Sequence, residues 1–284
     1  MGLSPRVDAH VHLWDLAARD QEWTTNFPAL HRSFGLDDLA PLTARSAVTA
    51  TVVVQTLNVP EETPELLAVA EANPLVRGVV GWVDLRGSGV GDRIADLRAL
   101  PGGDRLVGFR HLAQDESDDE WSCRSDVLEG LGDVEDSGLV YDVLVRSHQL
   151  RSAITAARAR PTLRFVLDHF GKPPIATGEI EPWRSLITEL ARCENVVVKF
   201  SGLVTEANLS KWSAKDLRPY VDVVLSAFGP RRMMFGSDWP VCQLAATYHE
   251  VVSVAQQLTS QLSAAEEGLV FGATAEHWYG LDLT

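Results

Sequence analysis

Short apolar runs rich in β-branched residues alternate with longer segments of helical periodicity along the whole chain. Such runs are typical of buried strands, and apolar residues three and four apart are typical of helices that cover them. The expected strands are Val7–Trp14, Ala50–Leu57, Val76–Leu85, Leu106–Leu112, Val140–Arg146, Arg164–Gly171, Asn195–Gly202 and Arg232–Pro240. The expected helices are Asp37–Arg45, Pro64–Asn73, Gly91–Leu100, Ser125–Asp136, Gln149–Arg160, Pro182–Glu194, Ala214–Phe228, Ala245–Leu258 and Ala264–Tyr279. Alternation of the two predicts parallel strands joined by right-handed crossovers.

The number of repeats predicts how the sheet is arranged. Eight strand–helix repeats suit a closed (β/α)8 barrel, which takes about 250 residues, and this chain has 284. No Gly/Ser or Pro linker divides it, so we expect one α/β domain, a TIM-like barrel over residues 1–284. The alternative, an open doubly wound sheet, usually has a Gly-rich phosphate loop after its first strand. Here the first strand ends in His12-Leu13-Trp14, which cannot form that loop.

Composition limits the partners of the chain. Asp and Glu outnumber Lys and Arg by 39 to 25, a net charge of −14, so nucleic acid and anionic membranes are unfavourable partners. No apolar run is long enough for a membrane span, and no signal-peptide core follows Met1. Three widely spaced cysteines indicate neither a disulfide framework nor a CxxC zinc site, which fits the cytoplasm. We expect a small-molecule substrate, and the sequence leaves a homo-oligomer open.

The first strand carries a His-X-His motif. Alternate residues of a strand share a face, so Asp8, His10, His12 and Trp14 are expected to face the barrel lumen, and the apolar residues between them the helices. Two imidazoles on one strand can converge on one cation. The alternative is a pair of hydrogen-bonded core histidines. The position at the end of the first strand favours a metal site, because barrel active sites lie at the carboxyl ends of strands.

Two later strands end in polar residues of the same kind. Asp168 and His169 end the sixth strand before a Gly-Lys-Pro turn, and Asp238 ends the eighth beside Gly236. His169 suits a third metal ligand or a donor to a reacting carbonyl, and Asp238 a ligand, a proton acceptor or both. The alternatives are a histidine that caps a turn and an aspartate that caps the next helix. Because the eighth strand pairs with the first in a closed barrel, we expect these residues to converge.

The combination resembles the amidohydrolase superfamily, and within it the lactonase-like group that includes sugar-lactone hydrolases and 2-pyrone-4,6-dicarboxylate lactonase. The matching segments are Asp8–Trp14, Gly108–His111, Asp168–Pro173, Val198–Leu203 and Phe235–Pro240. The resemblance implies a hydrolase whose site is at the carboxyl ends of the strands, with Asp238 as the proton acceptor. The residues implied as metal ligands are His10, His12, His169 and Asp238.

The resemblance also bears on the number of metal ions. Binuclear relatives have a bridging Lys or Glu on strand four, where this chain has Arg110 and His111. His148 follows strand five but is expected to open the next helix. One divalent ion, with zinc the first choice, is therefore expected. A reaction without metal stays open as the alternative, because some lactonases of the group are described as needing none.

Charged residues on the predicted strands are candidates for binding substrate. Arg110 and His111 suit a carboxylate or a cluster of hydroxyls, with an ion pair from Arg110 to Asp142 or Asp168 as the alternative. Lys199 lies in an apolar strand, where a charge needs a partner, so an ion pair to Asp168 or Asp238 is slightly favoured over substrate contact.

Uncharged side chains complete the predicted pocket. Trp14 and Trp239 are expected to wall it, because sugar faces stack on aromatic rings, while Trp82 is expected in the core. Gln55 is a further polar contact at the end of strand two. The function predicted is the opening of a small lactone, most simply a sugar-acid lactone. The alternatives are a metal-dependent decarboxylase of the same superfamily and a non-catalytic barrel that binds a sugar acid.

Overall fold

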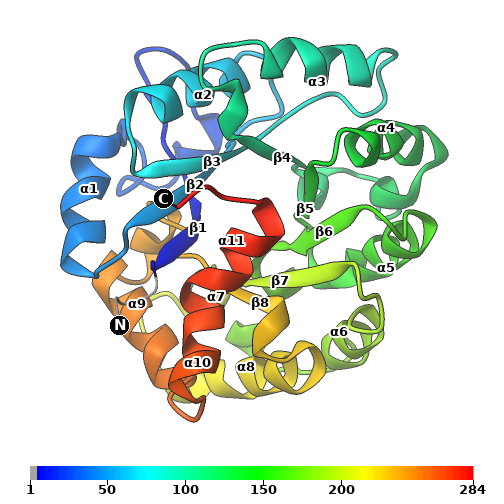
Figure 1. Cartoon of the computed structure of the whole chain (residues 1–284). Helices are drawn as coiled ribbons and strands as arrows, with labels where there is room; N and C mark the ends of the chain where they lie inside the picture. The colour runs from blue at the N-terminus through cyan, green and yellow to red at the C-terminus, as the bar shows by residue number, and fades with distance from the viewer. Residues whose placement is uncertain (1–4, 284) are drawn as a thin grey trace.

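A computed structural model describes residues 5–283 and shows a closed barrel of parallel strands (Figure 1). The strands pair in sequence order, β1 with β2 through to β7 with β8. The barrel closes where Val11 bridges Trp239 and the His12 amide donates to the Trp239 carbonyl over 2.7 Å. The strands are β1 Val7–Val11, β2 Ala50–Val54, β3 Val76–Gly81, β4 Leu106–His111, β5 Val140–Val143, β6 Arg164–Leu167, β7 Val196–Phe200 and β8 Met233–Phe235. The predicted (β/α)8 fold is confirmed, although every strand ends earlier than expected, because the rim residues form loops.

Helices surround the barrel, and each predicted helix is present (Figure 1). The helices Ser125–Asp136 and Ala214–Phe228 have the predicted ends, and the others, apart from the last, are shifted at one or both ends. The predicted last helix is divided into α10 and α11 by a π-helical turn at Leu269–Ala273, and the short α7 was not predicted. The helices are α1 Leu36–Arg45, α2 Glu62–Ala72, α3 Val90–Arg98, α4 Ser125–Asp136, α5 Leu150–Ala159, α6 Trp183–Leu190, α7 Leu203–Glu206, α8 Ala214–Phe228, α9 Tyr248–Leu258, α10 Ala264–Gly268 and α11 Thr274–Tyr279. In the part of the chain that the structure describes, no helix is long and apolar enough to span a membrane.

The barrel interior is apolar near the amino ends of the strands. Figure 1 shows α11 lying across one end of the barrel. Its Tyr279 packs with first residues of strands such as Val7 and Ala50, so α11 closes the amino end. A second apolar cluster fills the space between the strands and the outer helices. The interior is therefore free to take polar side chains only toward the carboxyl ends of the strands.

A β-bulge in β1 corrects the predicted facing of its residues. Asp8 pairs with Thr51 but Val11 pairs with Val53, so β1 has one residue more than β2 over this stretch. The alternation predicted for Asp8 is wrong: Ala9 packs in the interior cluster, while Asp8 faces outward and accepts a hydrogen bond from the Tyr248 hydroxyl of α9 over 3.0 Å. Bulges often re-aim side chains beside active sites. Because of the bulge, His10 also faces the interior, although it directly follows the interior residue Ala9.

Candidate active site

Three imidazoles surround one carboxylate at the carboxyl end of the barrel. Asp238 Oδ1 lies 3.7 Å from His10 Nε2, 3.5 Å from His12 Nε2 and 4.0 Å from His169 Nε2. The Nε2 atoms of His10 and His12 are 3.1 Å apart, and the ring centroids of His10 and His169 are 4.6 Å apart. All four side chains are buried. The convergence expected from the sequence is confirmed.

The backbone that presents two of these residues is unusual. His169 has φ +52° and Asp238 has φ +59°, in the left-handed region that few non-glycine residues adopt. Such conformations persist where surrounding contacts enforce them, and they cluster at active sites. The Asp238 amide donates to the His10 carbonyl over 2.9 Å, and the Ser237 amide to Asp8 Oδ1 over 2.8 Å. Asp8, which was predicted to face the lumen, therefore ties the β8 turn to β1 from outside the barrel.

A glycine packs directly against one imidazole of the cluster. Gly202 has φ +66°, and a Cβ placed there would lie 2.5 Å from His169 Nδ1 and 2.7 Å from its Cγ. Contacts this short do not occur, so any side chain at residue 202 must move the ring. The sequence signal for this requirement is the Ser-Gly pair at the end of β7.

We expect Gly202→Ala to displace His169 and lower turnover at least tenfold, because misplacing a catalytic group by about 1 Å can cost about 100-fold. The matched control is Gly178→Ala, since Gly178 has a similar φ of +73° and nothing within 4 Å of a built Cβ. Alanine at a positive φ strains the backbone in both variants, so both should lose thermal stability by a similar amount, which their melting temperatures measure. Equal turnover by the two variants would show that the contact with His169 is unimportant.

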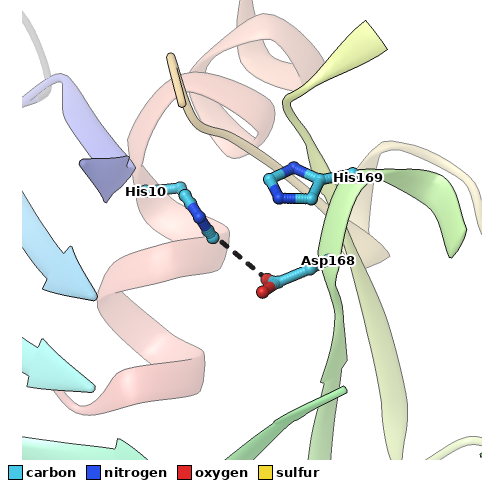
Figure 2. Close-up of side chains that lie close together, drawn as sticks. All are labelled: His10, Asp168 and His169. Carbon is cyan, nitrogen blue, oxygen red and sulfur yellow. Dashed lines mark ion pairs between the residues drawn. The ribbon is translucent and has the colours of Figure 1, made fainter. Parts of the chain in front are cut away.

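Each imidazole is oriented by a partner at its other nitrogen. His12 Nδ1 lies 2.7 Å from the Val54 carbonyl oxygen and His169 Nδ1 lies 2.8 Å from Ser201 Oγ. His10 Nδ1 lies 3.4 Å from Asp168 Oδ1, the pair marked in Figure 2. Such partners at the outer nitrogen fix the rings of metal-binding histidines. The three Nε2 atoms are thereby directed at the same point.

Burial controls the charge of the cluster. Burial, followed by the charge of Lys199, lowers the pKa of His10 well below its usual value, and burial lowers the pKa of His169 to about 4. For Asp238, burial alone would raise the pKa, but the neighbouring histidines, His169 first, outweigh it and lower the pKa below its ordinary value. At neutral pH the imidazoles of His10 and His169 are therefore neutral and the Asp238 carboxylate is ionised, the states in which these groups bind metal ions.

A buried ion network lies beneath the cluster. Lys199 Nζ is 2.5 Å from Asp142 Oδ2 and 3.2 Å from Asp168 Oδ1, and Arg110 Nη1 donates to Asp168 Oδ2 over 2.9 Å. The ion pair of Arg110 with Asp168 was foreseen as the alternative to substrate contact, and the ion pair of Lys199 with Asp168 was the slightly favoured prediction. The Asp142 partner of Lys199 was not foreseen, and neither was Tyr279, which donates to both Asp142 oxygens. Those contacts join residues far apart in the sequence, so only the fold reveals them.

The donor set fits a metal ion. Zinc bonded to nitrogen at 2.0–2.1 Å in a tetrahedron places its ligand atoms about 3.3 Å apart, close to the spacings in this cluster. His10, His12 and Asp238 form one group able to hold a metal, and His10, Asp168 and His169 form another. Two buried cations, Arg110 and Lys199, face three buried carboxylates, Asp142, Asp168 and Asp238. A divalent cation would offset the excess negative charge.

The remaining predicted contacts lie at the rim or in the core. Gln55 is buried, and Arg110 donates to its backbone and side-chain oxygens. His111 stacks on Trp121 with centroids 3.8 Å apart, and its Nε2 lies 2.8 Å from Glu116 Oε1. Trp82 was expected in the core; instead it is half-buried and donates to His111 Nδ1 over 3.1 Å, because it lies at the rim between two strand ends.

The two tryptophans expected to wall the pocket have different surroundings. Trp239 is fully buried and meets Phe34 edge-on. Trp14 lines a cavity of about 640 Å³ between the β1–α1 loop, α1 and α2, whose lining includes none of the four clustered residues. His148 is exposed and pairs with Asp119 before α5, as the sequence predicted for a residue that opens a helix. Contact of Trp14 or Trp239 with a substrate stays a prediction.

The barrel and the His/Asp cluster at its carboxyl end define a class, the metal-site hydrolases of the amidohydrolase type. The family model described as Amidohydrolase matches residues 7–281, and the chain belongs to this family. The resemblance seen in the sequence is thus confirmed.

Relatives of known name extend this result. The chain is 39% identical to an L-fucono-1,5-lactonase of Burkholderia ambifaria over 98% of its own length and 96% of that protein. It is similar to a crystal structure of an amidohydrolase from Burkholderia multivorans with bound zinc, at a TM-score of 0.92 and 38% identity, covering 98% of this chain and 100% of that one. The fold is shared with a probable 2-pyrone-4,6-dicarboxylic acid hydrolase from Acinetobacter baumannii. That structure matches at a TM-score of 0.81 and 17% identity, covering 97% of this chain and 99% of that one.

Proposed function

We propose that this chain hydrolyses the ring ester of a sugar-acid lactone, with L-fucono-1,5-lactone as the first compound to test. The observation that carries the proposal is similarity over nearly the whole chain to an L-fucono-1,5-lactonase, at 39% identity. The convergence of three imidazoles on one ionised carboxylate supports it, because ester hydrolysis needs a proton acceptor beside a group that stabilises negative charge.

We assign the proton transfers to Asp238. Its carboxylate is ionised at neutral pH and lies at the centre of the cluster, so it can take a proton from the attacking water. The same carboxyl group then gives the proton to the ring oxygen as the C–O bond of the tetrahedral intermediate breaks. The product is the open-chain hydroxy acid, and the carboxylate is restored.

The other residues of the cluster orient and stabilise. In a reaction without a metal ion, His169, held at Nδ1 by Ser201, would donate from Nε2 to the carbonyl oxygen as it gains negative charge. A divalent ion held by His10, His12, His169 and Asp238, with zinc the first choice, would polarise the carbonyl and acidify the water. Arg110, whose guanidinium is paired with Asp168, contributes positive charge beneath the site. Lys199 does the same in this proposal, and Gln55 fixes the Arg110 side chain.

A panel of lactones tests the substrate class. We expect release of acid, followed with a pH indicator and corrected for spontaneous opening, to be fastest with aldono-1,5-lactones that carry ring hydroxyls. The matched control compound is δ-valerolactone, which has the same ring without hydroxyls. Absence of turnover with every sugar lactone, by protein of confirmed fold, would reject the proposal. Carbon dioxide released from hydroxybenzoates would instead indicate a decarboxylase.

We also propose that the protein works in a reducing compartment such as the cytoplasm. Its three cysteines are free thiols, and two of them, Cys193 and Cys242, are buried. A small-molecule lactone as the substrate rests on the similarity to the lactonase, and a homo-oligomer stays a prediction.

A further inference from the structure

His10 has two neighbours at Nδ1 that make opposite demands on its proton. Lys199 Nζ lies 3.0 Å from this nitrogen, and Asp168 Oδ1 lies 3.4 Å from it. An ammonium can only donate a hydrogen bond, whereas a carboxylate can only accept one. Lys199 therefore favours an unprotonated Nδ1 with the proton on Nε2, and Asp168 favours the reverse. Both partners are fully buried, so neither is exposed to solvent.

The shorter contacts form one consistent chain of hydrogen bonds. His12 Nδ1 donates to the Val54 carbonyl over 2.7 Å, which leaves His12 Nε2 as an acceptor. His10 Nε2, 3.1 Å away, can then donate to it, and His10 Nδ1 accepts from Lys199. In this arrangement the buried Asp168 Oδ1 has the Lys199 ammonium 3.2 Å away but forms no hydrogen bond of regular geometry.

The longer contacts form the competing arrangement. With the proton on Nδ1, His10 donates to Asp168 Oδ1 over 3.4 Å, and its free Nε2 can accept from Arg110 Nη1 over 3.3 Å. Only in this form does Nε2 have a lone pair for a metal ion, because a ligating imidazole must leave that nitrogen unprotonated. The first arrangement has contacts of 3.0 and 3.1 Å, so it is the favoured one without a metal ion.

We propose that Lys199 is a positioning residue that keeps His10 as the Nε2–H tautomer, and that the site takes up a divalent cation only when this proton moves to Nδ1 and faces Asp168. The proton leaves one ring nitrogen and is placed on the other, so His10 releases none to solvent. Lys199 thereby weakens metal binding, and Asp168 supports it. The proposal concerns metal uptake and is independent of which lactone, if any, is hydrolysed.

The tautomer is measurable directly by ¹⁵N NMR of protein labelled at histidine, because protonated and unprotonated ring nitrogens have well separated shifts. The chain has 8 histidines, and a His10→Gln variant identifies the His10 signals by their loss. In protein stripped with a chelator we expect Nε2 to carry the proton, and after zinc is added we expect Nδ1 to carry it. A proton already on Nδ1 in the stripped protein would overturn the proposal.

Zinc affinity tests the role of Lys199 separately. Removing Lys199 alone would leave a buried carboxylate unpaired, so the informative variant is the double replacement Lys199→Met with Asp142→Asn, which removes one charge of each sign. We expect its Kd for zinc, measured by competition with a chromophoric chelator, to be lower than that of the unaltered protein by about tenfold, the effect of one hydrogen bond to a charged group.

The matched control removes a surface ion pair in the same way. Arg158 and Glu189 form an exposed pair at 2.9 Å, and Arg158→Met with Glu189→Gln should leave the Kd unchanged. An unchanged Kd in the Lys199 double variant, or no zinc binding by either protein, would contradict the proposal. Neither the ¹⁵N NMR measurement nor the zinc Kd depends on turnover. Both can therefore be interpreted even if the protein is not a lactonase.

Discussion

Asp238→Asn is expected to lower kcat for lactone opening by about 100-fold to 10,000-fold, the contribution typical of a positioned general acid–base group. The amide keeps the size of the side chain but cannot take a proton from water. It also removes the negative charge on which three imidazoles converge. KM should change little, because the proposed role of Asp238 lies in the transition state.

The control for this variant is an aspartate remote from the site. Asp104 precedes β4 at the amino end of the barrel with its side chain 73% exposed, so Asp104→Asn should retain full activity. The measurement is initial rate against substrate concentration for both variants, with melting temperatures to show that each is folded. A kcat within tenfold of the parent for a folded Asp238→Asn protein would show that another group moves the proton.

Lys199→Met alone is expected to destabilise the protein by roughly 3–5 kcal/mol, the cost of breaking a buried ion pair by removing one partner. Lys199 is fully buried, and its loss leaves Asp142 without its cation and Asp168 dependent on Arg110. A penalty of this size is a large part of the stability of a typical domain, about 5–15 kcal/mol. Much of the variant is therefore expected in the insoluble fraction.

The urea midpoint of the soluble fraction measures this effect, with exposed Lys215 of α8 replaced by Met as the control. The double replacement of Lys199 and Asp142 should recover part of the loss, because it removes both charges of the shortest pair. If Lys199→Met were as stable as Lys215→Met, the buried network would not contribute to folding as its geometry implies.

The barrel was predictable from the chain because its signals are local. Apolar runs and helical periodicity depend on residues within one turn or one strand, and a parallel topology follows from their alternation. The ends of the strands were harder to predict: the predicted Arg232–Pro240 strand is only Met233–Phe235. Beyond Phe235 the chain turns through the left-handed conformation of Asp238, which no sequence pattern of strands anticipates.

The candidate site was likewise predictable only in part. The ends of β1, β6 and β8 meet in any closed barrel, so His10, His12, His169 and Asp238 were placed together from the sequence. The facing of Asp8 was not predictable, since one bulged residue reverses the alternation of a strand. Trp82 was likewise placed in the core from its type alone, whereas its position at the rim depends on how two loops pack.

The sequence by itself determined which residue types stand at the end of each strand, and therefore the kind of chemistry the barrel can perform. Only the tertiary structure decided how those residues are charged and oriented. The bonds of Lys199 to Asp142 and to His10 join residues 57 and 189 positions apart. Such contacts depend on distances across the closed barrel, which the order of residues along the chain does not specify.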